Sequence, residues 1–377
     1  MKNPSSLYVH VPFCEQICHY CDFNKFFLKN QPVADYIEAC GHEMKMAQAQ
    51  TPIDTIYIGG GTPTALEDEQ LERLLELIHT YFIVKPDAEF TVEVNPGSAS
   101  GATFAMMRRY GVNRLSIGAQ TFDPGLLKVI NRDHGEGDVE TSIELARDAG
   151  ISDISIDMMF GLPGQTMEQW KQSLKRLVSL PIRHVSAYSL KIEPKTVFYQ
   201  MWNKGQLTLP GQDIEAEMYD WLYEYLHEKG FQAYEISNFA KPGYESLHNQ
   251  AYWNNDGYYG IGAGAHGYVD GVRHRNHGPL PKYLKAVEAG KKPWLEAHEV
   301  PVKEQMEEEM FMGLRKRIGV NGQRFESRYG LTVEEAFPGI VSKLQDRGLL
   351  QKENDQFRLT RQGLLLGNEV FEAFLLP

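Results

Sequence analysis

The sequence is poor in cysteine, lacks any long apolar run and has fewer basic than acidic residues. Four cysteines occur among 377 residues, and three of them fall within eight positions. This usage argues against a disulfide framework and for a metal or cofactor in a reduced compartment. No stretch approaches the roughly 18 apolar residues of a membrane span, and the N-terminus shows no secretory pattern. We therefore expect a cytoplasmic protein.

Positive charge is also scarce. Lysine and arginine together number 38, against 50 aspartates and glutamates, which gives a net charge of −12. Such a molecule as a whole repels nucleic acid and anionic membrane surfaces, so we expect no nucleic-acid partner. No repeat of solenoid period and no low-complexity segment is found. Because 377 residues exceed what one core usually supports, we expect two folded units.

From residue 7 to about 190, short β-branched runs alternate with amphipathic stretches, which is typical of βα units and a parallel sheet. The expected strands cover 7–11, 55–59, 90–94, 114–120, 153–158 and 184–190. The segment 67–82, with Leu71, Leu74, Leu75 and Ile78, spaces its apolar residues as an amphipathic helix does. We predict an α/β fold, a partial (β/α)6 barrel whose functional residues follow the carboxyl ends of the strands.

We expect this barrel core to cover 1–200. An aromatic- and glycine-rich segment over 201–298 is predicted to lie as loops over the open side of the barrel. A C-terminal domain over 299–377 regains helical periodicity and contains QKENDQFRLTRQG (351–363), which predicts a hairpin and a closing helix. Helices with a small hairpin indicate a helical, winged-helix-like unit, which we interpret as a packing domain.

The first expected strand is followed by CEQICHYCDF, which contains three closely spaced cysteines: Cys14, Cys18 and Cys21. This spacing allows three thiolates to bind three irons of one [4Fe–4S] cubane and leaves the fourth iron without a protein ligand. Two alternatives stay open: a zinc site with His19 or Asp22 as fourth ligand, and three unrelated buried cysteines. Cys40, in the helix-like segment VADYIEACGHEM, is interpreted as core.

Glycines and polar residues also follow the later strands. The turn Gly59–Pro63 has three consecutive glycines, whose backbone can approach a ligand closely. Glu93, Gln120, Arg132 and Asp157 stand at or just after the next strand ends. Each alone would be interpreted as solvating the barrel rim. Their recurrence at one edge predicts a shared site for a small molecule with amine, hydroxyl and carboxylate groups.

These motifs together resemble the radical-SAM coproporphyrinogen III oxidase-like family, and within it the branch of heme chaperones. The resemblance rests on YVHVPFCEQICHYCDF, IYIGGGTPT, EVNPG, RLSIGAQTF, the Arg132 region and DMMFGLPGQT, and it covers essentially the whole chain. It implies that the open iron of the cluster coordinates S-adenosylmethionine (SAM). The residues that the resemblance implies for the SAM site are Tyr8, Tyr20, Gly60, Gly61, Thr62, Glu93, Gln120, Arg132 and Asp157. Tyr188 and Ser189 resemble a further strand-end position.

The run from His248 to Trp253 is similar to the His-Asn-x-x-Tyr-Trp signature that this branch associates with heme. It assigns His248, Asn249, Tyr252 and Trp253 to heme binding. An imidazole can ligate heme iron, and aromatic rings can pack on the macrocycle. The alternative is a structural role, in which the histidine forms a hydrogen bond and the aromatics pack on the barrel. His266 and the HRNH run at 274–277 are rival ligands.

Two departures separate the chain from the oxidases of this family. The oxidases carry a further cysteine where this chain has Phe23, and a long extension before the cluster, whereas Cys14 lies near the start here. We therefore expect a radical-SAM fold without coproporphyrinogen oxidase activity.

The expected function is that of a heme chaperone, which binds heme and delivers it to a haem-dependent membrane or respiratory protein, meeting the membrane through that partner. One alternative is a radical-SAM oxygen-independent coproporphyrinogen III oxidase (dehydrogenase) that makes protoporphyrinogen IX. The other is a regulator that contains a structural zinc ion and acts on nucleic acid. The sequence leaves open whether the chain forms a homodimer.

Overall fold

Six parallel strands form the centre of a twelve-stranded sheet in the computed structural model, which describes residues 4–376. In spatial order they are β1 (Ser6–Val11), β4 (Ile53–Gly60), β5 (Val84–Val94), β6 (Arg114–Gln120), β7 (Asp153–Phe160) and β8 (His184–Ser189). All six strands expected from the sequence are present and lie next to each other in chain order, which confirms the six βα units.

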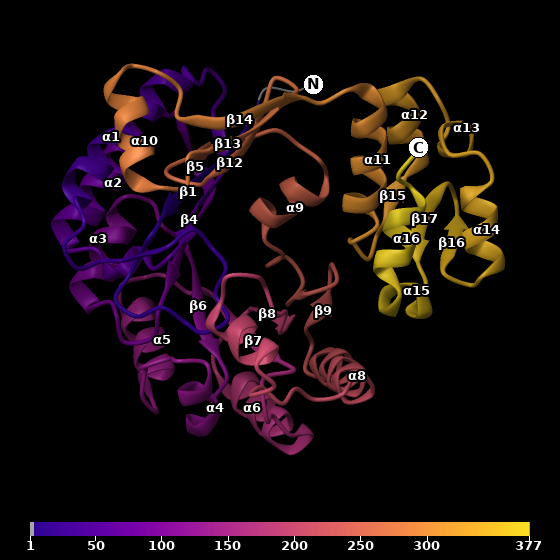
Figure 1. Cartoon of the computed structure of the whole chain (residues 1–377), viewed down its shortest axis with the longest axis horizontal. Coiled ribbons are helices and arrows are strands. Elements are labelled where there is room, and N and C mark those ends of the chain that lie inside the picture. The colour runs from indigo at the N-terminus through magenta and orange to yellow at the C-terminus, as the bar shows by residue number, and fades with distance from the viewer. Residues whose placement is uncertain (1–3, 377) are drawn as a thin grey trace.

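Helices follow the strands and lie in an arc along the outside of the sheet (Figure 1). They are α1 (Val33–Ala47), α2 (Asp68–Tyr81), α3 (Gly101–Arg109), α4 (Pro124–Val129), α5 (Asp138–Asp148) and α6 (Met167–Ser179). The hydroxyls of Ser100 and Thr166 accept hydrogen bonds from backbone N–H groups in the first turns of α3 and α6, so the sequence fixes where these helices begin. In the described part of the chain, no helix is long and apolar enough to span a membrane.

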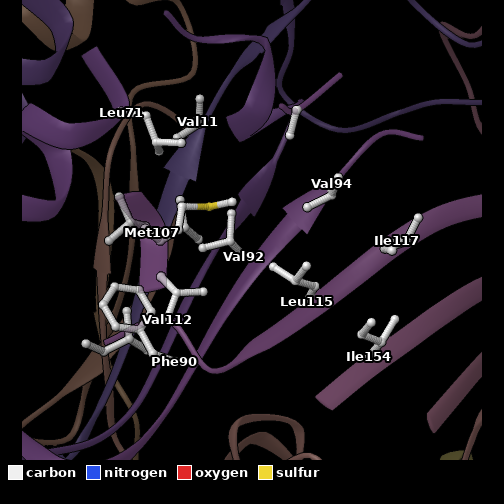
Figure 2. Packing of buried hydrophobic residues seen from close by; sticks show 14 of the residues in the cluster. Val11, Leu71, Phe90, Val92, Val94, Met107, Val112, Leu115, Ile117 and Ile154 are labelled. Atoms are coloured by element: carbon white, nitrogen blue, oxygen red, sulfur yellow. The ribbon is translucent and has the colours of Figure 1, made fainter. Parts of the chain in front are cut away.

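The two faces of the parallel sheet differ in chemistry because successive strand residues point to opposite sides. Facing the helices, Val92, Leu115 and Ile117 pack with Leu71 of α2 and Met107 of α3, all fully buried (Figure 2). The inner face carries polar and aromatic side chains. They include Thr55, Tyr57, Glu89, Thr91, Glu93, Arg114, Ser116, Asp153, Ser155, Asp157, His184 and Ser186.

The segment 201–298 extends this sheet at both edges, and the expectation of loops was wrong. Beyond β8 lie β10 (Asn238–Ala240) and β9 (Gln232–Ala233); beyond β1 lie β11 (Tyr258–Ile261), β12 (His266–Val269), β13 (Val272–Asn276) and β14 (Trp294–Glu299). Strand β11 pairs parallel with β1 and is therefore a seventh parallel strand. These strands were missed because each has only two to six residues, interrupted by glycines and polar side chains.

Four helices accompany these strands: α7 (Val197–Asn203), α8 (Gln212–Glu228), α9 (Leu247–Trp253) and α10 (Leu280–Glu288). Helix α10 packs on the outside near α1, whereas α9 lies between the sheet and the C-terminal domain (Figure 1). The hydrogen bonds of α9, described below, place it against the inner face of the barrel.

The C-terminal domain has a core of its own, which includes the fully buried rings of Phe325, Phe337 and Phe357. Its helices are α11 (Val302–Gly313), α12 (Gly322–Tyr329), α13 (Val333–Ala336), α14 (Ile340–Asp346), α15 (Arg361–Leu365) and α16 (Gly367–Ala373). Its sheet comprises β15 (Val320–Asn321), β16 (Leu350–Glu353) and β17 (Gln356–Leu359). The expected hairpin is confirmed; its turn is Asn354-Asp355, both with positive φ, which these residue types tolerate.

Candidate functional site

The predicted cluster loop is closed at its base by backbone pairing. Cys14 ends β2 (Phe13–Cys14), which pairs with β3 (Phe26–Phe27), and the Leu28 N–H donates to the Cys14 carbonyl at 2.9 Å. All three predicted ligands, Cys14, Cys18 and Cys21, are free thiols on this loop. Burial, with a smaller contribution from the charge that Cys21 and Cys18 would carry as thiolates, raises the pKa of Cys14 to about 11. The ionisation of Cys14 therefore depends on both other cysteines of the loop.

His19 and Asp22, the alternative fourth ligands of a zinc site, are not grouped with the cysteines into a metal site in the described part of the chain. The Nδ1 atom of His19 lies 3.1 Å from the Val129 carbonyl oxygen, and its ring packs against Phe198. Asp22 is exposed to solvent. Among residues 4–376, no three His, Cys, Asp or Glu side chains are arranged to hold a single metal ion. Three thiols without a fourth protein ligand fit the donor set of a cluster with one open iron better than a closed zinc site.

The glycine turn holds the cysteine segment in place. A Cβ at Gly61 would lie 2.7 Å from the carbonyl oxygens of Val11 and Phe13, to which the N–H groups of Gly61 and Thr62 donate at 2.8 Å. Gly60 has φ of +112° and lies against the ring of His10. The glycines are therefore needed because their backbone lies close to β1 and β2. The sequence analysis had expected such a close approach only to a ligand.

A chain of polar contacts leads from the first cysteine to the buried arginine. The Thr62 hydroxyl lies 3.8 Å from the Cys14 Sγ atom, and the Asn95 side chain donates to Thr62 at 3.2 Å. Arg132 Nη1 donates to Asn95 at 2.6 Å, and Nη2 lies 3.4 Å from the Tyr20 hydroxyl. Thr62, Tyr20 and Arg132, predicted from three separate motifs, thus share one site with the cysteine loop. Asn95, which was noted only as part of the strand end, connects them.

Two partly buried carboxyl groups line the same edge of the sheet. Glu93 accepts from the Tyr57 hydroxyl at 2.8 Å and from the Gly60 N–H at 2.9 Å; burial raises its pKa to about 7, and the charge of Asp157 adds to the shift. Asp157 accepts from the Ser116 hydroxyl at 3.0 Å, and burial raises its pKa also. Carboxyl groups that are partly removed from water suit an amine or hydroxyl ligand, whose donors would stabilise the charged form.

Gln120 and Tyr8 complete the predicted set. Gln120 is buried with a φ of +63°, at a bulge in the pairing of β6 with β7. A Cβ at Gly118 would lie 2.9 Å from the Gln120 amide nitrogen and 3.2 Å from Arg132 Nη2, so this glycine lets both side chains approach. The Tyr8 hydroxyl lies 2.8 Å from His10 Nδ1, and its ring stacks on Tyr57.

The remaining strand-end pair is only partly in the site. Tyr188 is 42% exposed, and the Ser189 hydroxyl donates to Glu215. A cavity of about 190 Å3 opens beside the cysteine loop, with Cys18, Thr62, Asn95 and Arg132 among its lining residues. A small polar molecule in this cavity would reach the loop directly.

The predicted heme segment forms α9 and is held firmly to the barrel. The Glu89 carboxylate on β5 accepts from the Ser246 hydroxyl and from the backbone N–H groups of Leu247 and His248, at 2.9 to 3.1 Å. His248 is 1% exposed; Nδ1 lies 2.9 Å from the Thr55 hydroxyl and Nε2 lies 2.8 Å from the Tyr252 hydroxyl. Burial lowers the pKa of His248 to about 3, so the ring is neutral. Both of its nitrogens are occupied in this structure.

The other members of the heme signature face different surroundings. The Asn249 N–H bonds to Ser246, and the guanidinium of Arg315 lies 4.6 Å above the ring of Trp253. Of the rival histidines, His274 is buried and stacks on Trp294, whereas His266 is exposed at the start of β12. Which imidazole contacts heme stays a prediction.

Apart from Glu93 and Asp157, the polar inner face is a part of the site that the sequence analysis missed. Ser116, Arg114 and Ser155 bond to Asp157, Asp153 and His184, and all six project inward. The signal was present in runs such as DISIDM, where polar and apolar residues alternate. Parallel strands covered on both faces are usually apolar throughout, so this alternation marks a polar barrel interior.

Comparison with known proteins gives the following similarities. The sequence profile of the Radical SAM superfamily matches residues 8–177, and that of the HemN C-terminal domain matches residues 300–366. A protein named heme chaperone HemW from Bacillus subtilis is 48% identical, over 98% of this chain and 99% of the relative. Proteins of the same name from Lactococcus lactis and Escherichia coli are 43% and 35% identical, over 100% and 99% of this chain and 98% of each relative.

Among solved structures, coproporphyrinogen III oxidase (HemN) from Escherichia coli, a radical SAM enzyme, has a TM-score of 0.87. The match covers 99% of this chain and 90% of that chain, at 24% identity. At this identity the likeness shows the fold, and it confirms the predicted fold class.

Proposed function

The chain belongs to the HemW family of heme chaperones within the radical SAM superfamily, and from this premise we propose that it binds heme and delivers it to haem-dependent membrane or respiratory proteins. The observation that carries the proposal is the position of the His-Asn-x-x-Tyr-Trp segment. It forms α9 against the inner face of the sheet, where the Tyr57 side chain connects His248 with the predicted SAM residue Glu93. We place the chain in a reducing, cytoplasmic compartment because only four cysteines occur and three of them are clustered, and the acceptor would provide contact with the membrane.

The residues of the cysteine loop fit a [4Fe–4S] cluster with one open iron, and we assign Cys14, Cys18 and Cys21 as its ligands. The chemistry that a bound cluster and SAM would supply is one-electron transfer to a sulfonium. The chain itself contributes the acceptors Glu93 and Asp157 for the amine and hydroxyl groups of SAM. Saturating SAM should therefore perturb the spectrum of the reconstituted protein, and Glu93→Ala or Asp157→Ala should weaken this effect.

The oxidase alternative is not favoured. The likeness to the oxidase structure extends to the fold, whereas the relatives with 35 to 48% identity are named heme chaperones. Phe23, which stands where the resemblance to the oxidases expects a cysteine, is 64% exposed beside the cluster loop.

Heme transfer tests the proposal directly. The reconstituted chain is loaded with heme, separated from free heme, and mixed under anaerobic conditions with an apo-cytochrome. We expect the absorption bands of the chain-bound heme to be replaced by those of the holo-cytochrome, faster than from free heme at the same concentration. Transfer no faster than from free heme, or a chain that retains no heme on gel filtration, would exclude a carrier role.

A further inference from the structure

His134 is an imidazole without a partner at the cavity beside the cysteine loop. It lines the same 190 Å3 cavity as Cys18 and Arg132. Both of its ring nitrogens are buried, and neither has a hydrogen-bond partner within the described part of the chain. Buried polar atoms are almost always bonded, so an imidazole of this kind indicates a ligand or water that completes its hydrogen bonds.

The loop that carries His134 is held in a defined conformation. The Gly135 N–H donates to the Asp138 carboxylate at 2.6 Å, and Ser142 donates to the Asp138 carbonyl at 2.7 Å. One oxygen of Asp138 is therefore engaged in its own loop. These contacts fix the loop and thereby position the imidazole, which forms no hydrogen bond itself within the described part of the chain.

The neighbouring charge determines which ligand group fits. Arg132 lies close enough to lower the pKa of His134, which burial and this charge together bring to about 4, so the imidazole is neutral and retains one N–H. No acidic side chain among residues 4–376 forms a salt bridge with Arg132, and its Nε atom is buried without a partner. Of the three acidic lining residues, Glu15 and Asp133 are exposed to solvent, and Asp138 accepts from the Gly135 N–H. A partly buried guanidinium whose Nε lacks a partner, next to a neutral imidazole N–H, favours an anionic oxygen ligand.

We propose that His134 contacts the amino-acid moiety of SAM, donating its N–H to the carboxylate that Arg132 attracts. This contact rests on the proposed SAM site and assigns it a residue outside the set that the resemblance implied. Arg132 and His134 would together hold this carboxylate. His134 thereby distinguishes ligands with an amino-acid group from those without one.

The test compares three ligands on the anaerobically reconstituted full chain by calorimetry. SAM and S-adenosylhomocysteine carry the amino-acid moiety, and methylthioadenosine lacks it. We expect His134→Phe, which keeps a ring without an N–H, to weaken binding of the first two about ten- to hundredfold and to leave methylthioadenosine unchanged. His134→Asn, which restores a donor, should recover part of the loss. His79→Ala, an exposed histidine on α2, is the matched control.

Unchanged SAM affinity in His134→Phe would mean that only water fills the cavity, and it would overturn the contact. Equal weakening of all three ligands, or loss of iron from both variants, would also overturn it, since His134 would then support the loop. If the parent chain binds no SAM, the proposed SAM site fails together with this contact. If the parent chain binds SAM and the His134 variants bind it equally well, the contact of His134 is refuted and the proposed SAM site stands.

Discussion

The imidazole of His248 stacks on the ring of Tyr57, with 5.4 Å between the ring centroids. The Tyr57 hydroxyl in turn donates to Glu93. The residue proposed to contact heme and the carboxyl proposed to contact SAM are therefore joined through one tyrosine. A movement of α9 would therefore change the surroundings of the Glu93 carboxyl.

Heme ligation by His248 requires one of its ring nitrogens to be released. We expect Tyr252→Phe, which frees Nε2 by removing one hydrogen bond of about 1 kcal/mol, to tighten heme binding about fivefold. His248→Ala should weaken heme retention and leave the iron content unchanged. Titration with hemin under anaerobic conditions measures both. If both variants bind heme like the parent, the ligand lies elsewhere, with His266 and His274 the next to be replaced.

Iron content tests the cysteine assignment. The anaerobically purified chain should be brown, with about four irons, and replacement of Cys14, Cys18 or Cys21 by Ala should remove the colour. Cys40→Ala is the matched control, because Cys40 lies on α1 and is buried against Tyr283. A colourless chain with stoichiometric zinc would refute the cluster assignment.

Gly61→Ala should disturb the cysteine loop without touching a cysteine. The new Cβ would lie 2.7 Å from two carbonyl oxygens of the β1–β2 segment, so that the backbone next to Cys14 must shift. We expect the iron content to fall to less than half that of the parent while the far-ultraviolet circular dichroism is unchanged. Gly211→Ala, at a position with open space for a Cβ, is the control. Full iron content in Gly61→Ala would show that the loop tolerates the shift.

Glu43 makes stability depend on pH. This carboxyl accepts from the Gly262 N–H, Asn276 and Tyr283, and burial raises its pKa to about 7. In an unfolded chain its pKa is about 4.3. Between these values the folded protein holds a proton that the unfolded chain has lost. The free energy of unfolding therefore falls as pH rises through this window, by about 1.4 kcal/mol per unit.

Glu43→Gln removes this titration. From pH 5.5 to 7.5, urea unfolding of the parent should lose about 2 kcal/mol more than the variant does. Parallel pH curves for the two proteins would mean that Glu43 stays ionised in the folded chain.

The sequence predicted those parts of the fold that depend on local pattern. Alternating runs located all six central strands, and polar residues at the ends of separate strands converged on one site, as Glu93, Arg132 and Asp157 do. Parallel strands necessarily bring their carboxyl ends to the same edge of a sheet, so this convergence follows from the topology.

The parts that could not be predicted depend on contacts between distant residues. Strand β11 joins the sheet by pairing Leu7 with Tyr259, and no local pattern encodes that partner. The bonding of His248 to Thr55, 193 positions earlier in the chain, likewise appears only after folding. The same holds for the glycine turn, whose close neighbours are backbone atoms of β1 and β2.

The central claim is that the chain carries heme and does not convert porphyrinogen, and both properties can be measured on one sample. The reconstituted chain, with a reduced cluster and SAM, is divided between a hemin titration and an assay with coproporphyrinogen III. The account predicts stable heme binding and no protoporphyrinogen IX beyond a single turnover. Multiple turnovers to protoporphyrinogen IX by a chain that retains no heme would contradict it.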